Sequence, residues 1–406
     1  MHGGSAPSSA ARQGGGRPIV SETLFNDPEL LRRFGITRVG DITDLDVIGV
    51  PVWFAVRPNS RGLSVAQGKG LTVRQARLSA VMEAIEGAVA EDVQRHVKHH
   101  GSWRQLRERG MPLVSFDTLA RVDCNAFDPE RERAWVSGYS VRTGEEVLAP
   151  YELIGMDFRA DFPWDRQAFH MGSQGLAAGF DFDRTVLHAL LELVENDACF
   201  TVDAFETRRL ALRPFLAQPK ANRPLDELLV RLAGLGIKPR LFDLTGANGV
   251  PVVMASLQRS IVAMDGPGER AAGGVACRLD PDEAALAALL EAIQSRLTDI
   301  SGARDDLAAT RYDADRSAAR GTAPPAVHSR AAIPATPVIA TGYAAPAWRQ
   351  LADHLFTSGV DDICIFPLES DTPGITVVRV LANGLAVAGN GMNTFSLGAL
   401  DAFLHS

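Results

Sequence analysis

Two pairs of glutamates with the same spacing are the residues in this sequence that could most readily do chemistry: Glu83 with Glu86, and Glu192 with Glu195. Residues three apart on a helix share a face, so each pair would present two carboxylates side by side. A single Glu-x-x-Glu pair is usually a solvated helix surface. Both pairs here have apolar flanks, which predicts largely buried helices, where unpaired carboxylates are costly. Facing carboxylates repel unless a cation lies between them, and Mg²⁺, which binds a few carboxylates together with phosphate oxygens, is the expected ion.

The two pairs lie in segments that resemble each other over their full length. Residues 70–86 read GLTVRQARLSAVMEAIE and residues 179–195 read GFDFDRTVLHALLELVE, each with twelve residues between the glycine and the Glu-x-x-Glu. A third stretch, 287–294 (AALLEAIQ), keeps the same helix end with Gln294 in place of the second carboxylate. Copies separated by roughly a hundred residues are too far apart for a solenoid. The pattern predicts a duplication, with the third stretch as a candidate third copy, whose elements face each other in one site.

The segment before the first helix contains residues suited to phosphate. Residues 64–72 read SVAQGKGLT, in which the glycines allow close backbone approach and Lys69 offers a point cation. This is not a Walker A loop, because a glycine follows the lysine where Ser or Thr should stand, and an ordinary surface turn is the equal alternative. In the third copy, Gln294, Arg296 and Arg304 could donate to phosphate oxygens. The alternative for the two arginines is a salt bridge with a nearby aspartate: Asp299, Asp305 or Asp306.

Other titratable side chains are weaker candidates. His96, His99 and His100 are predicted to end a polar helix as solvated residues rather than to bind a metal. Cys199 follows Glu195 by one helical turn and is interpreted as a small buried residue.

The composition is typical of an ordinary globular protein, with 406 residues, 46% hydrophobic and 22% charged. The net charge of −8 is unsuited to DNA or RNA, whose binding needs clustered cations, so no nucleic acid is expected. No apolar run is long enough to span a bilayer. Residues 1–20, rich in Gly, Ser and Ala, are expected to form a disordered arm. The four cysteines are scattered without a C-x-x-C pair, which predicts a cytoplasmic protein without a zinc site.

Strand and helix patterns are interspersed along the chain, which predicts a mixed α/β (α+β) fold. Extended segments rich in β-branched residues are expected at 50–57, 250–257, 271–279, 361–366 and 375–382. Helical periodicity is clearest at 71–92, 182–204, 281–299 and 346–357. Residues 303–345, rich in Ala, Arg, Asp and Pro, are interpreted as a long, partly ordered excursion. These elements must bring the two glutamate pairs together if the pairs are to act as one site.

At these motifs the sequence resembles the YcaO family of ATP-dependent enzymes. The resemblance lies in QGKGLT followed by ARLSAVMEAIE, in GLAAG followed by HALLELVENDA, and in EAIQSRLTDISGARDD. It covers most of the chain from about residue 36 onward, and residues 35–58 resemble the subgroup usually found beside a TfuA partner protein. The resemblance implies a YcaO-like fold with repeated strand–helix units around a central ATP site. Residues 21–406 would form that catalytic unit, with the core motifs at 64–306.

Roles for individual residues follow from this resemblance. The family's first signature, Ser-x-x-x-Glu-x-x-Glu-Arg, is matched by Ser79, Glu83 and Glu86, and its second acidic motif by Glu192 and Glu195. The resemblance makes the four glutamates ligands of Mg²⁺ and ATP. The residues assigned to ATP binding are Lys69, Ser79, Gln294, Arg296, Arg304 and Arg38. No residue is assigned as catalytic.

What the family implies is phosphorylation of a peptide backbone amide. A nucleophile adds to the amide carbonyl, the resulting oxyanion takes the γ-phosphoryl group of ATP, and phosphate then leaves. Such a transfer depends mainly on positioning and on neutralising negative charge. A Cys, Ser or Thr side chain of the substrate as the nucleophile gives an azoline, whereas external sulfide gives a thioamide.

Three functions are consistent with the sequence. Azoline-forming members typically end in a proline-rich tail, whereas this sequence ends GALDAFLHS, so the resemblance favours a TfuA-partnered thioamide synthetase over a cyclodehydratase. The family commonly has arginine after each second glutamate, and Gly87 and Asn196 stand there instead. That difference leaves open a non-catalytic, nucleotide-binding accessory protein. The expected partners are a peptide or protein substrate, a TfuA-like protein, an external sulfur donor and a second copy of the chain in a homodimer.

Overall fold

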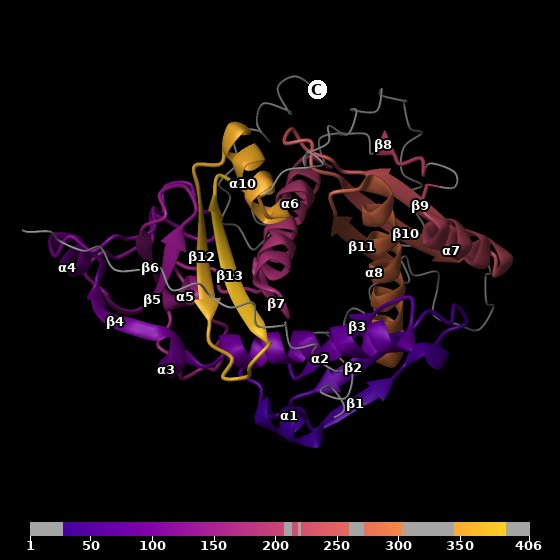
Figure 1. Ribbon diagram of the computed structural model, residues 1–406, viewed down its shortest axis with the longest axis horizontal. Coiled ribbons are helices and arrows are strands. Elements are labelled where there is room, and N and C mark those ends of the chain that lie inside the picture. The colour runs from indigo at the N-terminus through magenta and orange to yellow at the C-terminus, as the bar shows by residue number, and fades with distance from the viewer. Residues whose placement is uncertain are drawn as a thin grey trace, which may run out of the picture.

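The computed structural model describes residues 27–206, 213–217, 221–259, 272–302, 304 and 345–386. The arm expected at 1–20 and, apart from residues 304 and 345, the excursion expected at 303–345 lie outside the described residues. The described part has a mixed α+β fold, as the sequence predicts. It consists of three antiparallel sheets and the helices that pack on them (Figure 1).

The three sheets draw on different parts of the chain. The first has the order β1-β2-β3: β1 (Arg38–Asp41), β2 (Val52–Val56) and β3 (Val65–Lys69). The second has the order β11-β10-β9-β8: β8 (Arg213–Pro214), β9 (Ile237–Asp243), β10 (Val252–Arg259) and β11 (Ala272–Cys277). The third has the order β4-β5-β12-β13-β7, with β6 paired to β5: β4 (Val97–Ser102), β5 (Glu132–Ser140), β6 (Glu146–Pro150), β7 (Leu176–Gly179), β12 (Asp362–Leu368) and β13 (Thr376–Asn383).

Each sheet ends in a strand that leads into a long helix. Strand β3 is followed by α2 (Val73–Ala90), β7 by α6 (Phe182–Glu206), and β11 by α8 (Pro281–Ser301). In the view of Figure 1, α2 lies across the lower part of the molecule, above α1 and β1, and α6 and α8 rise above it. The three strand–helix units therefore surround one centre, with an edge strand and a helix of each turned toward it.

Local sequence explains where two of these helices begin. Thr72 caps α2 in a capping box, since its side chain accepts from the N–H of Gln75 and the Gln75 side chain accepts from the N–H of Thr72. Helix α8 starts with Asp280 as N-cap and Pro281 in the first turn, and it ends at Gly302 in the left-handed conformation. The other helices are α1 (Pro28–Arg33), the 3-10 turn η2 (Thr43–Leu45), α3 (Val93–His96), α4 (Trp103–Glu108), α5 (Tyr151–Ile154), α7 (Arg223–Gly234) and α10 (Ala347–Thr357).

Glycines let two of the central helices pack directly on their strands. A Cβ on Gly68 of β3 would lie 2.0 Å from the backbone nitrogen of Ala80 in α2. A Cβ on Gly274 of β11 would lie 2.4 Å from the backbone nitrogen of Ala292 in α8. Neither gap accommodates a side chain, so these glycines serve helix–strand packing. The surface turn that was the alternative interpretation of the GKG segment is wrong for Gly68 and Lys69, which belong to strand β3.

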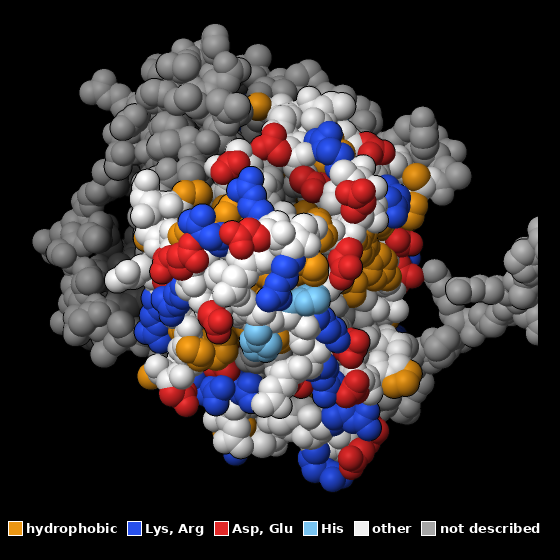
Figure 2. Space-filling view, turned by 90° about the vertical axis from the view of Figure 1, so that its left-hand side faces the viewer, with side chains coloured by type: hydrophobic (Ala, Val, Ile, Leu, Met, Phe, Trp, Pro, Cys, Tyr) orange, Lys and Arg blue, Asp and Glu red, His pale blue; other side chains and the backbone are white. Residues whose placement is uncertain are grey.

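The apolar interior is divided into three clusters around the centre. One joins α2 to the third sheet, a second joins α6 and α10 to β12 and β13, and a third joins α7 and α8 to the second sheet. On the face shown in Figure 2, acidic and basic side chains are interspersed rather than gathered in a basic patch. Among the described residues, the helices are too short or too polar to cross a membrane.

The long periodic elements were predicted well and the short ones were not. All five expected strands and all four expected helices are present, with ends shifted by a few residues. The histidine segment is a correction: His96 ends α3, but His99 and His100 lie on β4, an edge strand paired with β5. Alternating exposed and half-buried residues along β4 are the strand pattern that a helical interpretation misses.

Candidate functional site

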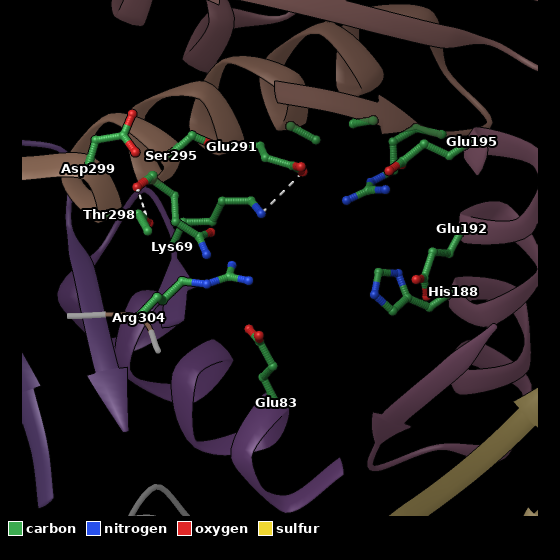
Figure 3. Close-up of a pocket in the computed structure, with 14 residues that line it drawn as sticks. Lys69, Glu83, His188, Glu192, Glu195, Glu291, Ser295, Thr298, Asp299 and Arg304 are labelled. Atoms are coloured by element: carbon green, nitrogen blue, oxygen red, sulfur yellow. Dashed lines mark hydrogen bonds and ion pairs between the residues drawn. The ribbon is translucent and has the colours of Figure 1, made fainter. Parts of the chain in front are cut away.

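A cavity of about 440 Å³ lies where the three strand–helix units meet. Figure 3 shows Glu83 entering it from α2, Glu291 and Asp299 from α8, and His188, Glu192 and Glu195 from α6. The lining residues are Lys69, Glu83, His188, Glu192, Glu195, Ala276, Arg278, Ala287, Glu291, Gln294, Ser295, Thr298, Asp299 and Arg304. Segments more than two hundred residues apart in the sequence thus form one polar site.

Three of the four motif glutamates line this cavity. Glu83 comes from the first copy, and Glu192 and Glu195 come from the second. Glu86 is half-buried beside them, not part of the lining, and close enough to Glu83 and Glu192 to be repelled by both. The predicted convergence of the two pairs is therefore what the structure shows, with Glu86 set behind the other three.

Backbone N–H groups of the edge strands hold the carboxylates in place. The backbone N–H groups of Gln67 in β3, Ala178 in β7 and Gly175 just before β7 act to lower the pKa of Glu83, Glu86 and Glu192, respectively. The N–H of Cys277 in β11 donates to Oε2 of Glu195 at 2.9 Å. An edge strand has N–H groups without strand partners, so a carboxylate is a natural acceptor there. The motif glutamates thus lie near the rims of the sheets, and Glu195 is bound by a strand of another unit.

Burial is the largest cause of the raised pKa of all four carboxyl groups. Neighbouring carboxylates add to it: Glu291 for Glu83 and Glu195, Glu195 and Glu291 for Glu192, and Glu192 and Glu83 for Glu86. The pKa is raised to about 7 for Glu83, about 8 for Glu192 and about 7 for Glu195. For Glu86 burial comes first and then the charges of Glu192 and Glu83, and together they lift its pKa well above the ordinary value. The side chain of Glu83 is exposed to solvent in the cavity. The protein atoms that surround it still reduce its hydration enough to raise its pKa. Crowded carboxyl groups with pKa values raised this far are ones whose ionised forms are not fully compensated by cations of the protein.

The donor set fits a hard cation with phosphate. Among the described residues, no group of three or more His, Cys, Asp or Glu side chains is close enough together to hold a metal ion as it stands. The carboxylates nevertheless offer oxygen atoms alone, as Mg²⁺ prefers, and Mg²⁺ characteristically takes its remaining ligands from phosphate and water. A cation would also relieve the repulsion that raises their pKa values.

The other wall of the cavity carries positive charge. Nζ of Lys69 lies 3.4 Å from Oε2 of Glu291, and this pair is partly exposed to the cavity (Figure 3). Arg278 and Arg304 complete the cationic lining. Oε1 of Gln294 is buried and has no hydrogen-bond partner among the described residues. Acidic and basic side chains thus face each other across a space suited to metal-bound triphosphate.

Three of the residues assigned to ATP lie outside the cavity lining. Arg296 instead binds Asp46 through two hydrogen bonds, Nε to Oδ2 at 2.8 Å and Nη2 to Oδ1 at 3.0 Å. This is the salt-bridge alternative with an aspartate distant in sequence. Arg38 is an exposed residue of β1, and Ser79 is a half-buried residue of α2. Lys69, Gln294 and Arg304 line the cavity, and the assignment of all six residues to ATP stays a prediction.

The two positions that depart from the family signature have local explanations. A Cβ on Gly87 would lie 3.2 Å from Nη1 of Arg57, so a larger residue would press on that guanidinium. Arg57 itself is held by Glu91 through both of its terminal nitrogens. Asn196 uses its side chain to donate to the backbone oxygen of Glu192 at 2.8 Å. Neither residue lines the cavity, so their replacement of arginine does not remove a group from its wall.

Sequence reasoning missed several residues of the lining, among them His188, Glu291 and Arg278. His188 lies one turn before Glu192, and burial, Arg278 and Lys69 lower its pKa to about 4, so it is neutral. Glu291 and Arg278 belong to the third copy, where their spacing matches that of Glu83 and Gly70. The repeat therefore contained the signal: Glu291 occupies the position of the first glutamate in each pair.

A scan against family models identifies the YcaO cyclodehydratase family, described as ATP- and Mg²⁺-binding, over residues 67–386. That match covers most of the chain. This protein belongs to the YcaO family. The YcaO chain uses ATP and Mg²⁺ as its cofactors, which agrees with the acidic and basic walls of the cavity.

Curated relatives and solved structures support this assignment. An uncharacterised protein in the tfuA 3′ region of Rhizobium leguminosarum bv. trifolii is 34% identical over 373 residues, covering 88% of this chain and 85% of the relative. An uncharacterised protein of Mycobacterium tuberculosis is 30% identical, covering 76% and 68%. The YcaO structure from Methanopyrus kandleri bound with AMPPCP and Mg²⁺ has a TM-score of 0.65 at 23% identity and covers 90% of both chains. A heterocyclase in complex with substrate and cofactor has a TM-score of 0.66 at 18% identity, covering 90% of this chain and 53% of that one.

Proposed function

We propose that this YcaO protein uses ATP and Mg²⁺ to phosphorylate a peptide backbone amide, and that the product is a thioamide formed with a TfuA-like partner. The observation that carries the proposal is the cavity itself. Carboxylates of α2 and α6 share its lining with the cationic side chains of Lys69, Arg278 and Arg304. An acidic wall for the metal and a basic wall for phosphate are what phosphoryl transfer from Mg·ATP requires.

Each wall has a separate task in this proposal. Glu83, Glu86, Glu192 and Glu195 hold Mg²⁺, and their bound backbone N–H groups keep the oxygens oriented. Lys69, Arg278 and Arg304 bind phosphate oxygens. To do so, Lys69 leaves its partly exposed ion pair with Glu291 and pairs with phosphate instead. When bound, Mg·ATP supplies the phosphoryl group and neutralises the charge that spreads over it in the transition state.

The chemistry balances with hydrosulfide as the nucleophile. Sulfur adds to the amide carbon, and the carbonyl oxygen becomes an oxyanion. That oxygen takes the γ-phosphoryl group, and ADP leaves. The carbon–oxygen bond then breaks with loss of the sulfur-bound proton, which gives a thioamide and inorganic phosphate.

Support for a thioamide product comes from the relatives. The Rhizobium leguminosarum relative named for the tfuA region matches nearly the full length of this chain at 34% identity. The heterocyclase and the Escherichia coli microcin synthetase structures share the fold at only 18% and 12% identity. We therefore place azoline formation second and a non-catalytic accessory role third. A cytoplasmic location and a homodimer are part of the same proposal.

The deciding experiment combines the protein, ATP, Mg²⁺, sulfide, a TfuA-like protein and the peptides encoded beside the gene, and follows phosphate release and peptide mass. The expected result is peptide-dependent ATP hydrolysis with exchange of one oxygen for sulfur. The Glu192→Gln variant should be inactive, while Glu108→Gln, an exposed position on α4, serves as the matched control and should retain activity.

Each other outcome selects a different function. Loss of water from the peptide without sulfide would assign azoline formation. Binding of Mg·ATP without hydrolysis, whichever peptide is added, would assign the accessory role. Retention of full activity by Glu192→Gln would separate the carboxylates from the chemistry altogether.

A further inference from the structure

Strand β11 is an edge of the second sheet, and its end borders the cavity. It pairs with β10 on one side, and none of the described strands pairs with its other side. Ala276 in the strand and Arg278 just after it line the cavity. An edge strand has a row of backbone N–H and C=O groups to which another chain can bond. Strand β11 therefore offers such groups next to the site.

Two hydrogen bonds at the end of β11 show which of its residues point away from the sheet. The N–H of Arg278 donates to the carbonyl of Pro251, just before β10, at 3.1 Å. The N–H of Cys277 points the other way and donates to a carboxylate of α6 at 2.9 Å. Backbone groups alternate in direction along a strand. The N–H and C=O groups of Gly273 and Val275 therefore point away from β10, like those of Cys277.

This edge is open at Gly273 and Val275. Their outward N–H and C=O groups have no hydrogen-bond partner in the part of the chain that the structure describes. Gly273 is exposed, and because glycine has no side chain, its exposed surface is the backbone itself. Apart from chain neighbours, a Cβ on Gly273 would come within 4 Å of one described atom, the backbone oxygen of Ala255 at 3.8 Å. A ligand can therefore reach the backbone of β11 here.

The corresponding edge strands of the other two units are less accessible. Among the residues of β3, β7 and β11, which are all described, Gly273 is the exposed one. Gln67 of β3 is 2% exposed, and its side chain accepts from the hydroxyl of Thr298. In β7 the N–H of Leu176 donates to the carbonyl of Ser173 at 2.8 Å. An added strand is therefore best accommodated at β11.

The open edge ends where the cavity begins. The N–H of Cys277 donates to Oε2 of Glu195, and the carbonyl of Cys277 accepts from Nη1 of Arg278 at 2.7 Å. A chain paired with Val275 cannot continue its pairing at Cys277 and must leave β11 there. Two residues of a strand span about 7 Å. The next amides of such a chain would therefore lie beside Glu195 in the cavity.

We propose that the peptide substrate binds as an additional strand on β11, bonded to Gly273 and Val275, and that this pairing presents the amide to be modified beside Glu195. The inference rests on the proposed function, in which the substrate is a peptide. Pairing through the main chain provides affinity with little selection of side chains. The substrate class is therefore an extended segment without proline next to the modified amide, whose side chains vary freely.

The test is the KM for the peptide in ATP hydrolysis, measured with the peptide that the parent modifies. Val275→Pro removes one outward N–H, and an edge strand tolerates proline where the N–H has no partner in the sheet. Loss of one hydrogen bond should raise the KM for the peptide by about 5- to 10-fold, with kcat near the parental value. The affinity for Mg²⁺ with the non-hydrolysable analogue AMPPCP should not change.

Two control variants isolate the effect of the N–H group. Val275→Ala keeps the N–H and loses side-chain packing, so its KM should equal that of the parent. Val39→Pro makes the same change in β1, an edge strand outside the cavity lining, at a valine that is also half-buried. The N–H of Ile42 donates to Val52 of β2, so the N–H of Val39, three residues earlier, points outward. A parental KM in Val275→Pro, or an equal rise in either control, would overturn the proposal.

A scan of N-methylated peptides decides if Val275→Pro does not fold. Methylation should raise the KM at alternate residues next to the modified amide, and the lack of such alternation would contradict strand addition. Hydrogen exchange at Gly273 and Val275 should slow when the peptide binds. Slow exchange already in the free protein would show that another segment or a second copy covers β11, and the proposal would fail. A parent without peptide-dependent ATP hydrolysis would instead remove the proposed function, and the inference with it.

Discussion

Two glutamates near the end of α2, Glu86 and Glu91, show opposite ways of burying a carboxylate. Glu91 is 6% exposed, and Arg57 binds both of its oxygens, at 3.2 and 2.7 Å, while Ser60 donates to one of them. Glu86 has one backbone N–H, no direct cation, and the charges of Glu83 and Glu192 beside it. Five residues along one helix separate a satisfied structural ion pair from a carboxylate that lacks a counterion.

The difference teaches how to distinguish a structural site from a binding site in this fold. A buried charge that is kept for stability has its partner in the protein, as Glu91 has Arg57 and Asp165 has Arg133. The motif glutamates are held by backbone N–H groups and pushed toward protonation by one another. They are therefore prepared for a partner that the chain itself does not supply.

The largest expected effect comes from breaking the satisfied pair. Glu91→Gln leaves Arg57 buried without its carboxylate and should lower the free energy of unfolding by about 3–5 kcal/mol. The stabilisation gained on adding Mg·AMPPCP should be the same as in the parent. Chemical denaturation with and without the ligand measures both quantities, and Glu108→Gln should change neither. A loss of ligand-induced stabilisation would mean that Glu91 also serves the nucleotide site.

The second prediction concerns the glutamates of the cavity, which lack a paired cation of the kind that Arg57 supplies to Glu91. Saturating Mg·AMPPCP, at about a hundred times its dissociation constant, should stabilise the parent by about 2.7 kcal/mol. Glu192→Gln and Glu83→Gln should lose most of that gain, while their apo forms stay folded and are no less stable, because one repelling charge is gone. Thermal unfolding of parent and variants shows the difference. Full ligand-induced stabilisation in either variant contradicts the assignment of that glutamate.

Replacing Arg296 tests whether its partner Asp46 is, like Glu91, a buried carboxylate that serves stability rather than ligand binding. Its partner Asp46 has a side chain only 3% exposed, so Arg296→Gln should lower the free energy of unfolding by about 1–3 kcal/mol. Because Arg296 is outside the cavity lining, affinity for Mg·AMPPCP should change by no more than about twofold, the usual range for positions away from a site. Titration calorimetry decides this. A loss of affinity well beyond that range would restore the sequence-based assignment of Arg296 to phosphate.

A smaller effect is expected from pH. The pKa values of Glu83 and Glu195, about 7, and of Glu192, about 8, lie above the ordinary value of 4.5. Between pH 4.5 and about 8, these carboxyl groups bind more protons in the folded protein than in the unfolded chain. Their contribution to the free energy of unfolding therefore falls as pH rises. His188, with its pKa lowered to about 4 from 6.5, acts in the opposite sense below 6.5.

The decline in apo stability should therefore be clearest between about pH 6.5 and 8, where only the carboxylates still lose protons. Mg·AMPPCP should bind more tightly over the same range, since the metal needs the ionised forms. Denaturation curves at several pH values measure the slope, which should be shallower in Glu192→Gln. A stability that rises with pH in this range would show that the carboxylates are already neutralised in the apo protein.

The sequence predicted the acidic half of the site because its signal is local. Glu-x-x-Glu on an apolar helix, repeated at the same distance from a glycine, identifies Glu83, Glu86, Glu192 and Glu195 without knowledge of the fold. The long helices and the apolar strands were predictable for the same reason. The third copy was recognised through Gln294, while Glu291, at the matching position, was overlooked.

Partners distant in the sequence could not be predicted in this way. Arg296 finds Asp46 across 250 residues, and nothing near Arg296 in the sequence indicates that choice. Arg379 carries a weak local signal, a single arginine within the apolar strand ITVVRVLA, which is unusual because a buried guanidinium needs acceptors. Its acceptors are the carbonyls of Ile154, at the end of α5, and of Gln174, which only the packed fold brings to it.

The central claim is that carboxylates of α2 and α6 jointly bind the metal of a metal–nucleotide complex. The most direct measurement is a crystal structure with Mn²⁺ and AMPPCP, in which anomalous scattering locates the metal. The account predicts the metal between Glu83 or Glu86 and Glu192 or Glu195, with phosphate oxygens toward Lys69, Arg278 and Arg304. Metal bound elsewhere, or bound by carboxylates of one helix alone, would contradict it.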